Sequence, residues 1–510
     1  MAEADAQRFR GIEAATGQPI EPDYPISTVA DVDAACAAAT AAFDAYRETD
    51  AEARAAFLEA IGEEIMALGD ALLDRAARES GLPLARLTGE RGRTVGQLKL
   101  FAQVVRDGLW RQVRIDPAMP DRQPLPRADL RMRMVPLGPV AVFGASNFPL
   151  AFSTAGGDTA AALAAGCPVV VKGHPAHPGT DAMVAGAIRA AAQRTGMPDG
   201  VFGHVAGPGN ALGTALVQDP RIAAVGFTGS RAGGLALVRL AQARDVPIPV
   251  YAEMSSVNPV VVMPAALAAR GAALGTAFVG SLTMGAGQFC TNPGLVLAVE
   301  GDGIDAFEAA AAEALGGHAP QPMLTGGIRA AYAEGTAALA GNAAVRELAC
   351  GQAGDGVASE TARLFVTDAA AVRSDPALTE EVFGASSLIV RCRDLDELAA
   401  ILDTVEGQLT ATILLDEADH EPARRLVPIL ERKAGRVLAN GWPTGVEVAP
   451  AMVHGGPFPA TSDGRSTSVG TLAIDRFLRP VCYQDLPELL LPPELRDGAA
   501  GPRLVDGKPA

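Results

Sequence analysis

Apolar residues recur at helical spacing near the start of the chain, over residues 32–46 and 50–77. This period of 3.6 residues is typical of helices that bury one face. Thr49 stands three residues before Glu52, which is the spacing of a capping box at a helix start. The pattern therefore predicts a helix over each stretch, the second one capped by Thr49.

The pattern changes after Pro139, where short β-branched runs alternate with Ala-rich stretches of helical spacing. The expected strands are 140–143, 169–171, 201–205 and 223–227, and the expected helices are 151–165, 180–195, 210–218 and 233–243. A second block has expected strands at 259–263, 295–299, 387–390 and 411–415. This alternation is typical of parallel sheets covered by helices on both faces, so we predict an α/β protein.

Two segments depart from the alternation. Residues 113–135 contain four prolines and are expected to form an extended excursion from the main body. Exposed strand edges are a liability in a monomer, so we expect residues 475–484 to pair with the excursion of a neighbouring subunit, in a homodimer or homotetramer. The sequence after Leu491 is rich in Pro and Gly and is expected to be peripheral.

Composition excludes several classes of protein. The chain has 510 residues, of which 49% are hydrophobic and 20% are charged, so we expect a large core and exclude extensive disorder. It carries 59 acidic and 42 basic residues, a net charge of −17. A surface of that sign repels phosphate backbones, so we expect no nucleic-acid partner.

Two stretches without charge, 134–157 and 271–299, have the apolar character of membrane segments. Both are interrupted by Gly, Pro, Asn, Ser or Thr, so core elements joined by tight loops explain them better, and we expect no membrane partner. Residues 1–10 carry acids and no apolar run, so no secretory signal is expected. We therefore predict a cytoplasmic protein.

Two glycine-containing turns stand where an expected strand is followed by an expected helix. GPGNALG at 207–213, which includes Gly209, is one residue longer than the G-x-G-x-x-G loop, and a plain turn is an equal alternative. TGS at 228–230 repeats the order, and the helix N-terminus after it offers free N–H groups to an anion. Two such junctions in one sheet favour a dinucleotide site.

The six cysteines are too sparse for a disulfide scaffold and form no C-x-x-C pair. Cys290 lies among Gly, Pro and small residues, which suggests a loop entering a confined site, although a buried structural cysteine is the common alternative. No charged neighbour in sequence would lower its pKa, so a thiolate there needs a helix N-terminus, a bound positive ring or a distant base. His174 and His177 have no further ligand nearby, so we expect no metal site.

Six short sequences occur in an order that resembles the aldehyde dehydrogenase superfamily over nearly the whole chain. They are GASNFP at 144–149, Lys172 after a valine run, FTGS at 227–230, EMSSVNP at 253–259, GQFC at 287–290 and EVFG at 381–384. One such string can arise by chance, but six in order are a specific match. The resemblance implies NAD(P)-dependent oxidation of an aldehyde.

The resemblance implies a role for each matching residue. Cys290 would be the nucleophile, Asn147 the side-chain donor of the oxyanion hole, and Glu253 the base that activates water for deacylation. A carboxyl pKa raised by burial would suit that last task. The cofactor would be held by Lys172, His174, Gly209, Gly229, Ser230, Arg231, Glu381 and Phe383. A turn role for Asn147 and a solvated strand end at Lys172 are the structural alternatives.

The sequence KGHP at 172–175 departs from the KPAE of many family members, whose Glu binds the 2′-hydroxyl of the ribose. Loss of that carboxylate removes a repulsion against a 2′-phosphate. Arg231 adds a possible phosphate partner, although it could equally point to solvent. We therefore expect NADP to be preferred, with NAD used at weaker affinity. The family's Glu-Leu-Gly-Gly is EMSS at 253–256, a change for which we have no interpretation.

Further strings narrow the resemblance to the 2-oxoglutarate semialdehyde (2,5-dioxovalerate) dehydrogenases of sugar-acid or hydroxyproline breakdown. They are RGRTVGQLKLF at 91–101, GGDT at 156–159, HPAHP at 174–178, NGWPTGVEV at 440–448, MVHGGP at 452–457 and TSDGR at 461–465. A bacterial fatty-aldehyde dehydrogenase branch shares part of this pattern. The alternatives are therefore a fatty aldehyde or another semialdehyde as substrate, or a catalytically silent protein of the same fold.

The resemblance also implies how the chain is divided. A Rossmann-like cofactor-binding domain would comprise residues 1–112 and 136–253, and an α/β catalytic domain residues 254–450. A small β oligomerisation element would comprise residues 113–135 and 475–490. A return segment at 451–474 and a tail at 491–510 complete the chain.

Overall fold

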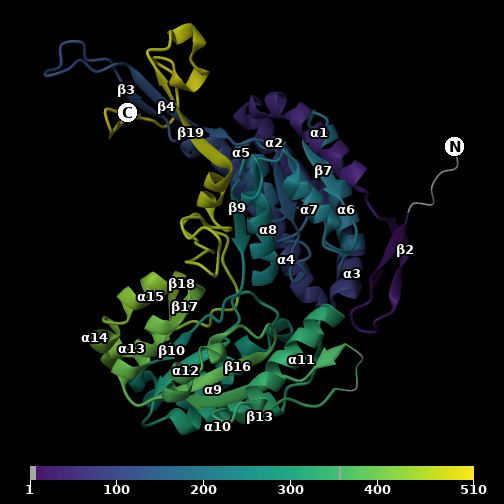
Figure 1. Ribbon diagram of the computed structural model, residues 1–510, viewed down its shortest axis with the longest axis vertical. Coiled ribbons are helices and arrows are strands. Elements are labelled where there is room, and N and C mark those ends of the chain that lie inside the picture. The colour runs from purple at the N-terminus through teal and green to yellow at the C-terminus, as the bar shows by residue number, and fades with distance from the viewer. Residues whose placement is uncertain (1–6, 355, 357) are drawn as a thin grey trace.

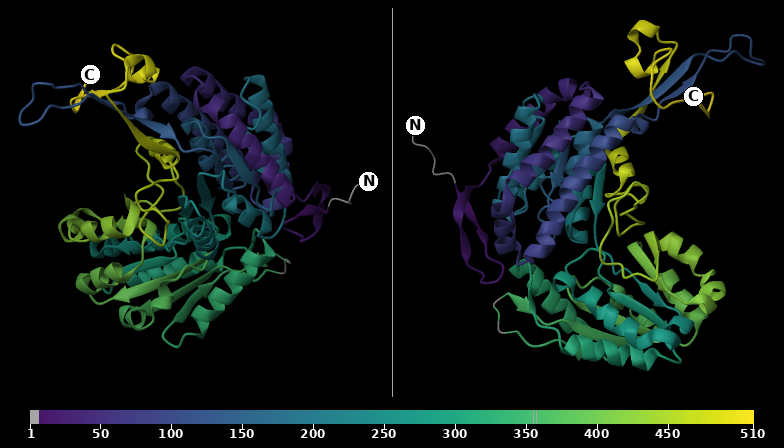
Figure 2. Two further views of the ribbon diagram at one scale, coloured as in Figure 1. Left: turned by 45° about the horizontal axis from the view of Figure 1, so that its top comes forward. Right: turned by 180° about the vertical axis from the view of Figure 1, so that it is seen from behind.

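The computed structural model describes residues 7–354, 356 and 358–510. Residues 1–6, part of the stretch 1–10 in which no secretory signal is expected, therefore lie outside the described part. The chain forms two layered α/β bodies with a narrow β arm beside one of them (Figure 1). A hairpin of β1 (Arg8–Ile12) and β2 (Pro19–Pro25) precedes the first body, on the side away from the arm (Figure 2).

Four helices open the first body: α1 (Val29–Arg47), α2 (Ala51–Ala67), α3 (Gly69–Ser80) and α4 (Leu84–Asp107). The single helix predicted over 50–77 is wrong, because Gly69 adopts φ +60° and separates α2 from α3. The predicted cap is also wrong. The Asp50 carboxylate accepts from the N–H of Ala53 at 2.8 Å, whereas the Thr49 hydroxyl turns back to donate to a carbonyl of α1.

The N-terminal α/β body (residues 29–111 and 140–253) is built on a parallel sheet of order β7-β6-β5-β8-β9. Its strands are β5 (Val140–Phe143), β6 (Val169–Lys172), β7 (Phe202–Val205), β8 (Ala224–Thr228) and β9 (Val250–Glu253). Its helices are α5 (Gly157–Ala165), α6 (Pro178–Arg194), α7 (Ala211–Gln218) and α8 (Arg231–Gln242). Because the strands are parallel, Lys172, Thr228 and Glu253 end at one edge of the sheet.

Two cores cover this sheet. Helices α1, α7 and α8 pack on one face, and α2 to α6 pack on the other. The predicted helix over 151–165 begins only at Gly157, because residues 150–156 form consecutive turns that bend the chain between β5 and α5. The four strands expected in this block are present, and β9 is a fifth that the apolar pattern did not predict.

The C-terminal α/β body (residues 260–439) is built on a seven-stranded sheet of order β13-β15-β16-β11-β10-β17-β18, parallel except at β13. Its strands are β10 (Val260–Val262), β11 (Leu295–Val299), β13 (Arg346–Cys350), β15 (Arg363–Asp368), β16 (Ser386–Cys392), β17 (Gln408–Leu414) and β18 (Ala434–Ala439). Its helices are α9 (Pro264–Leu282), α10 (Ile304–Gly316), α11 (Gly326–Gly341), α12 (Ala369–Ser374), α13 (Leu395–Thr404), α14 (His420–Ala423) and α15 (Val427–Lys433). A two-residue pair, β12 (Gln321–Pro322) with β14 (Ser359–Glu360), lies beside it.

Helix α9 is, within the described part of the chain, the one helix long and apolar enough to cross a membrane. Its apolar residues pack instead into the core on one face of the seven-stranded sheet. Phe278 of α9 stacks on Phe307 of α10 with ring centroids 5.9 Å apart. These contacts are those of a core helix.

The arm is a five-stranded sheet of order β19-β4-β3-β20-β21. Its strands are β3 (Arg114–Asp116), β4 (Leu130–Pro136), β19 (Leu478–Gln484), β20 (Leu504–Val505) and β21 (Lys508–Pro509). The predicted pairing of residues 475–484 with a neighbouring subunit is wrong, because β19 pairs antiparallel with β4 of its own chain. The backbone N–H of Leu137 donates to the carbonyl of Phe477 at 3.0 Å and brings the two strands together.

The tail after Leu491 is part of the arm, outside the two α/β bodies. β20 pairs parallel with β3, and the fully buried Leu495 packs with Val113 and Ile115. Apolar residues spaced among prolines thus complete a small core of their own.

Candidate active site

A cavity of about 670 Å³ lies at the carboxyl edge of the five-stranded sheet, between the two α/β bodies. Residues of β5, β6, β8 and β9 and the turns that follow them line one wall, and residues from the C-terminal body line the other. The predicted site residues that line it are Asn147, Lys172, His174, Gly209, Gly229, Ser230, Glu253, Cys290, Glu381 and Phe383. This edge is where α/β sheets bind their ligands.

Arg231 is the predicted site residue that the structure does not place on the cavity wall. It begins α8, and its guanidinium forms an ion pair with Glu406 at 2.7 Å and lies over the ring of Phe458. Arg231 therefore pairs with a carboxylate of its own chain. The structure corrects the prediction that Arg231 is free to bind the cofactor.

Cys290 lies in the loop between α9 and β11 and reaches the cavity from the C-terminal body. The loop passes so close to residues 384 and 385 that a Cβ on Gly287 would lie 2.3 Å from their backbone, and Gly287 has φ +68°. Only glycine fits there. Burial, and next the carboxylate of Glu253, raise the pKa of the Cys290 thiol well above its ordinary value. The thiol therefore needs a base to become a nucleophile.

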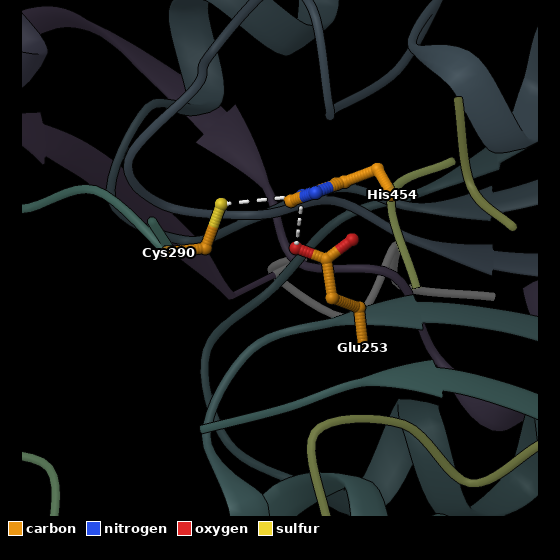
Figure 3. Close-up of side chains that lie close together, drawn as sticks. All are labelled: Glu253, Cys290 and His454. Atoms are coloured by element: carbon orange, nitrogen blue, oxygen red, sulfur yellow. Dashed lines mark hydrogen bonds and ion pairs between the residues drawn. The ribbon is translucent and has the colours of Figure 1, made fainter. Parts of the chain in front are cut away.

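His454 lies beside the thiol and can act as such a base. Its Nε2 atom lies 3.4 Å from the Sγ atom of Cys290 and 2.9 Å from Oε1 of Glu253, and the three side chains converge from three separate segments (Figure 3). The return segment holds His454 in place, because its backbone N–H donates to the Thr467 hydroxyl at 2.8 Å. Sequence reasoning missed this residue: it stood in the MVHGGP string, where nothing local marks a histidine as catalytic.

Glu253 ends β9 and is 4% exposed. Burial raises the pKa of its carboxyl. The neighbouring His454 and the Ser468 hydroxyl, which donates to Oε2 at 2.8 Å, lower this pKa by more, so the net shift is downward. The raised pKa that would suit a base is therefore absent, and the carboxylate is ionised at neutral pH. The donor atoms of Glu253, Cys290 and His454 lie within 4.8 Å of one another and could hold a metal ion, so the expectation of no metal stays a prediction.

Asn147 lies in the turn after β5 and is buried beside the Cys290 loop. Its Nδ2 atom donates to the carbonyl of Gln288 at 3.1 Å, which leaves the second amide hydrogen free. The backbone N–H of Cys290 has no acceptor among the described residues. An amide hydrogen and a backbone N–H next to the nucleophile are the donors that an oxyanion requires.

The environment of Lys172 indicates whether the cavity suits a dinucleotide. Its side chain is 8% exposed and lines the cavity, and within the described residues it forms neither an ion pair nor a hydrogen bond. Burial lowers its pKa. An ammonium buried without an acceptor is costly, so hydroxyl or phosphate oxygens of a ligand would satisfy it. The first N–H groups of α8, behind Gly229 and Ser230, are available for a phosphate in the same way.

Two acidic residues line the cavity, Glu253 and Glu381. Neither belongs to the turn after β6, where Pro175 stands. Burial raises the pKa of Glu381 to about 7, against the opposing hydrogen bonds from Ser255 and Ser256. Burial and the neighbouring cations lower the pKa of His174 to about 3, so this imidazole is neutral.

The comparisons with known proteins agree with this geometry. The model of the aldehyde dehydrogenase family matches residues 1–467. A relative from Azospirillum brasilense named alpha-ketoglutaric semialdehyde dehydrogenase 2 is 61% identical, over 99% of this chain and 96% of the relative. Another from Acinetobacter baylyi, named alpha-ketoglutaric semialdehyde dehydrogenase, is 50% identical over 97% and 94% of the two chains.

Solved structures show the same fold. The aldehyde dehydrogenase of Bacillus cereus aligns with a TM-score of 0.80 at 20% identity, over 95% of this chain and 94% of that one. The match to the family model and the identity to the two relatives extend over most of the chain. The protein therefore belongs to the aldehyde dehydrogenase family of NAD(P)-dependent enzymes.

Proposed function

We propose that the protein oxidises 2-oxoglutarate semialdehyde to 2-oxoglutarate with NAD(P). The names of the two relatives at 61% and 50% identity support this substrate. The observation that carries the activity is the contact of Cys290 with His454, beside the ionised Glu253 and the free donors of Asn147 and Cys290.

The residues of the chain divide the chemistry between them. The imidazole of His454 accepts the proton of the Cys290 thiol, and the thiolate attacks the aldehyde carbon to give a thiohemiacetal. The Asn147 amide and the Cys290 N–H donate to the oxygen on which charge develops. NAD(P), when bound, supplies the acceptor for the hydride that leaves this carbon. Glu253 then accepts a proton from the water that attacks the resulting thioester.

Steady-state turnover with a panel of aldehydes and both cofactors tests the proposal. We expect 2-oxoglutarate semialdehyde to give the highest kcat/KM and Cys290→Ala to abolish turnover. A higher kcat/KM for long-chain aldehydes would favour the fatty-aldehyde alternative. Absence of NAD(P)H formation with every aldehyde would leave the catalytically silent protein as the explanation.

We propose further that NADP is preferred over NAD. Lys172 and Pro175 support this: within the described residues Lys172 is a buried cation without a hydrogen-bond or ion-pair partner, and Pro175 puts no carboxylate on the cavity wall after β6 to repel a 2′-phosphate. A charge-assisted hydrogen bond from Lys172 favours NADP by about 1.4 kcal/mol, or tenfold, after desolvation. The proposal no longer includes Arg231, because Glu406 pairs with it.

The proposed activity assigns a task to each part of the chain. We assign residues 1–112 and 136–253 to cofactor binding, 254–450 to catalysis, and 113–135 with 475–490 to assembly of a homodimer or homotetramer. Leu125 and Leu489 on these assembly elements, 69% and 84% exposed, are large apolar side chains that a subunit contact would cover. Light scattering at micromolar concentration tests assembly, and a monomeric mass would refute it. A cytoplasmic setting, and sugar-acid or hydroxyproline breakdown as the pathway, stay predictions.

A further inference from the structure

Two arginines of α4, Arg86 and Arg93, lie near the Cys290 loop without belonging to the cofactor cavity. They are seven residues apart, which places both on one face of the helix, two turns from each other. Neither forms an ion pair with a carboxylate in the described part of the chain. Both nevertheless have buried guanidinium nitrogens.

Arg86 contacts the loop directly. Its guanidinium lies over the ring of Phe289, 4.3 Å from the centroid, and over that of Phe148, 4.9 Å away. Its Nη2 atom donates to the carbonyl of Asn147 at 2.8 Å, which helps to orient the proposed oxyanion donor. Its Nη1 atom is buried and has no hydrogen-bond partner.

Arg93 has still fewer partners. Its Nη1 atom donates to the carbonyl of Val446, whereas Nε and Nη2 are buried and have none. Its guanidinium lies 5.4 Å from the ring centroid of Phe152, and that ring lies 6.1 Å from the ring of His454. Arg93 is therefore one aromatic ring away from the base that contacts Cys290.

Arg54 shows how this chain satisfies a buried guanidinium that has only a structural role. It lies deep in the N-terminal body, and its two terminal nitrogens donate to four backbone carbonyls. In Arg54, Arg75, Arg133 and Arg436 the Nε atom alone is buried without a hydrogen-bond partner, whereas in Arg93 both Nε and a terminal nitrogen have none. Burying N–H groups of a cation without acceptors costs free energy, and a ligand with acceptor oxygens removes that cost.

The surroundings of Arg93 select the type of ligand. Arg436, whose Nε is also buried without a partner, adds a second positive charge beside it. The carboxylates of Glu90, Glu447 and Glu253 act on Arg93 from a distance, but within the described residues none of them forms an ion pair or a hydrogen bond with it, so Nε and Nη2 of Arg93 keep no acceptor. A guanidinium binds a carboxylate with two parallel hydrogen bonds, and the phenylalanine rings around it can pack on methylene groups. The surroundings therefore suit a short methylene chain that ends in a carboxylate.

We propose that Arg93, assisted by Arg86 and Arg436, binds the carboxylate at the far end of the aldehyde substrate. This inference rests on the proposed function and names the residues that select an acidic aldehyde over an uncharged one. Nε and Nη2 of Arg93 donate to the two carboxylate oxygens, while the aldehyde carbon lies at Cys290.

The test compares acidic and uncharged aldehydes of equal length in Arg93→Met, Arg93→Lys and a control. The matched control is Arg91→Met, on the same helix, whose guanidinium donates to the carbonyl of Gly69 away from the site. For Arg93→Met we expect kcat/KM to fall on the order of 100-fold with 2-oxoglutarate semialdehyde and with succinic semialdehyde, and at most about threefold with pentanal and butanal. Arg93→Lys should retain an intermediate preference, and Arg91→Met should retain that of the wild type.

A second measurement does not depend on turnover. 2-Oxoglutarate should slow the alkylation of Cys290 by iodoacetamide in the wild type and in Arg91→Met, and should not slow it in Arg93→Met. Equal losses with acidic and uncharged aldehydes, or unchanged protection, would show that Arg93 only supports the fold and would overturn the inference. If the wild type does not oxidise 2-oxoglutarate semialdehyde, the proposed function fails, whereas the ratio of succinic semialdehyde to butanal still decides the role of Arg93.

Discussion

The Nε2 atom of His454 lies 3.4 Å from the Sγ atom of Cys290, although 164 positions separate the two residues. The same nitrogen is 2.9 Å from Oε1 of Glu253. One imidazole thus stands between the nucleophile and the carboxylate that activates water. It can accept the thiol proton and remain as a cation next to an anion.

Replacing His454 by Gln removes that base and leaves a side chain of similar size. We expect kcat/KM to fall on the order of 100-fold or more, because the raised pKa of the thiol leaves little thiolate without it. The rate at which iodoacetamide alkylates Cys290 in the absence of aldehyde should fall in parallel. The exposed His420, on α14, provides the control His420→Gln. An alkylation rate equal to that of the wild type would show that His454 does not activate the thiol.

Glu253→Gln keeps the shape of the side chain and removes its negative charge. Ser468 can still donate to the amide oxygen, so the fold of the return segment should be retained. We expect a rapid burst of NAD(P)H followed by slow turnover. Thioester hydrolysis loses its base in this variant, whereas hydride transfer does not depend on Glu253. Stopped-flow absorbance measures both phases. Slow hydride transfer without a burst would contradict the assigned role.

Glu381 gives cofactor binding a pH dependence. Burial raises the pKa of its carboxyl to about 7 in the free protein. Below pH 7 the group is mostly protonated, and above pH 7 it is ionised and can accept hydrogen bonds from ribose hydroxyls. If only the ionised form binds, the Kd for NAD(P) increases about tenfold from pH 8 to pH 6.

Fluorescence titration of the cofactor at several pH values measures this effect. Two other groups that line the cavity do not titrate in this interval, because the pKa of Glu253 is lowered and that of His174 is about 3. The variant Glu381→Gln should therefore bind with a nearly constant Kd. A pH dependence that persists in this variant would assign the titration to another group.

Pro175→Glu restores the carboxylate that many family members carry at this position. The new charge should repel a 2′-phosphate and accept from a 2′-hydroxyl, so we expect the ratio of kcat/KM for NADP to that for NAD to fall about tenfold or more. Arg231→Ala should leave this ratio unchanged, because Glu406 already pairs with the guanidinium. A fall of the ratio in Arg231→Ala would mean that the cofactor displaces Glu406.

Strong local patterns in the sequence were sufficient for much of the fold and for most of the cavity. Valine-rich runs such as β10 are buried on both faces, so their apolar sequence is enough to predict a strand. Cys290, Asn147 and Glu253 line one cavity, as the family resemblance implies. β18 was not predicted, because its Arg and its exposed positions interrupt the apolar pattern of a buried strand. A single Gly between apolar runs concealed the break between α2 and α3.

The remaining errors concern contacts between distant segments. Nothing around His454 or Arg93 reveals what the folded chain places beside them, since both functions arise from neighbours far away in sequence. The ion pair of Arg231 with Glu406 spans 175 positions, and the pairing of β19 with β4 is of the same kind. Such contacts depend on topology, which local periodicity does not contain.

The return segment also determines when the enzyme becomes reactive. Met254 donates to the carbonyl of Ala460 at 2.7 Å, and Glu253 bridges to Thr461, so the segment is fixed beside β9 only after both are present. During synthesis Cys290 and Glu253 leave the ribosome before His454, so the imidazole joins the site last. A nascent or truncated chain that stops before His454 therefore lacks the side chain that contacts both Sγ of Cys290 and Oε1 of Glu253.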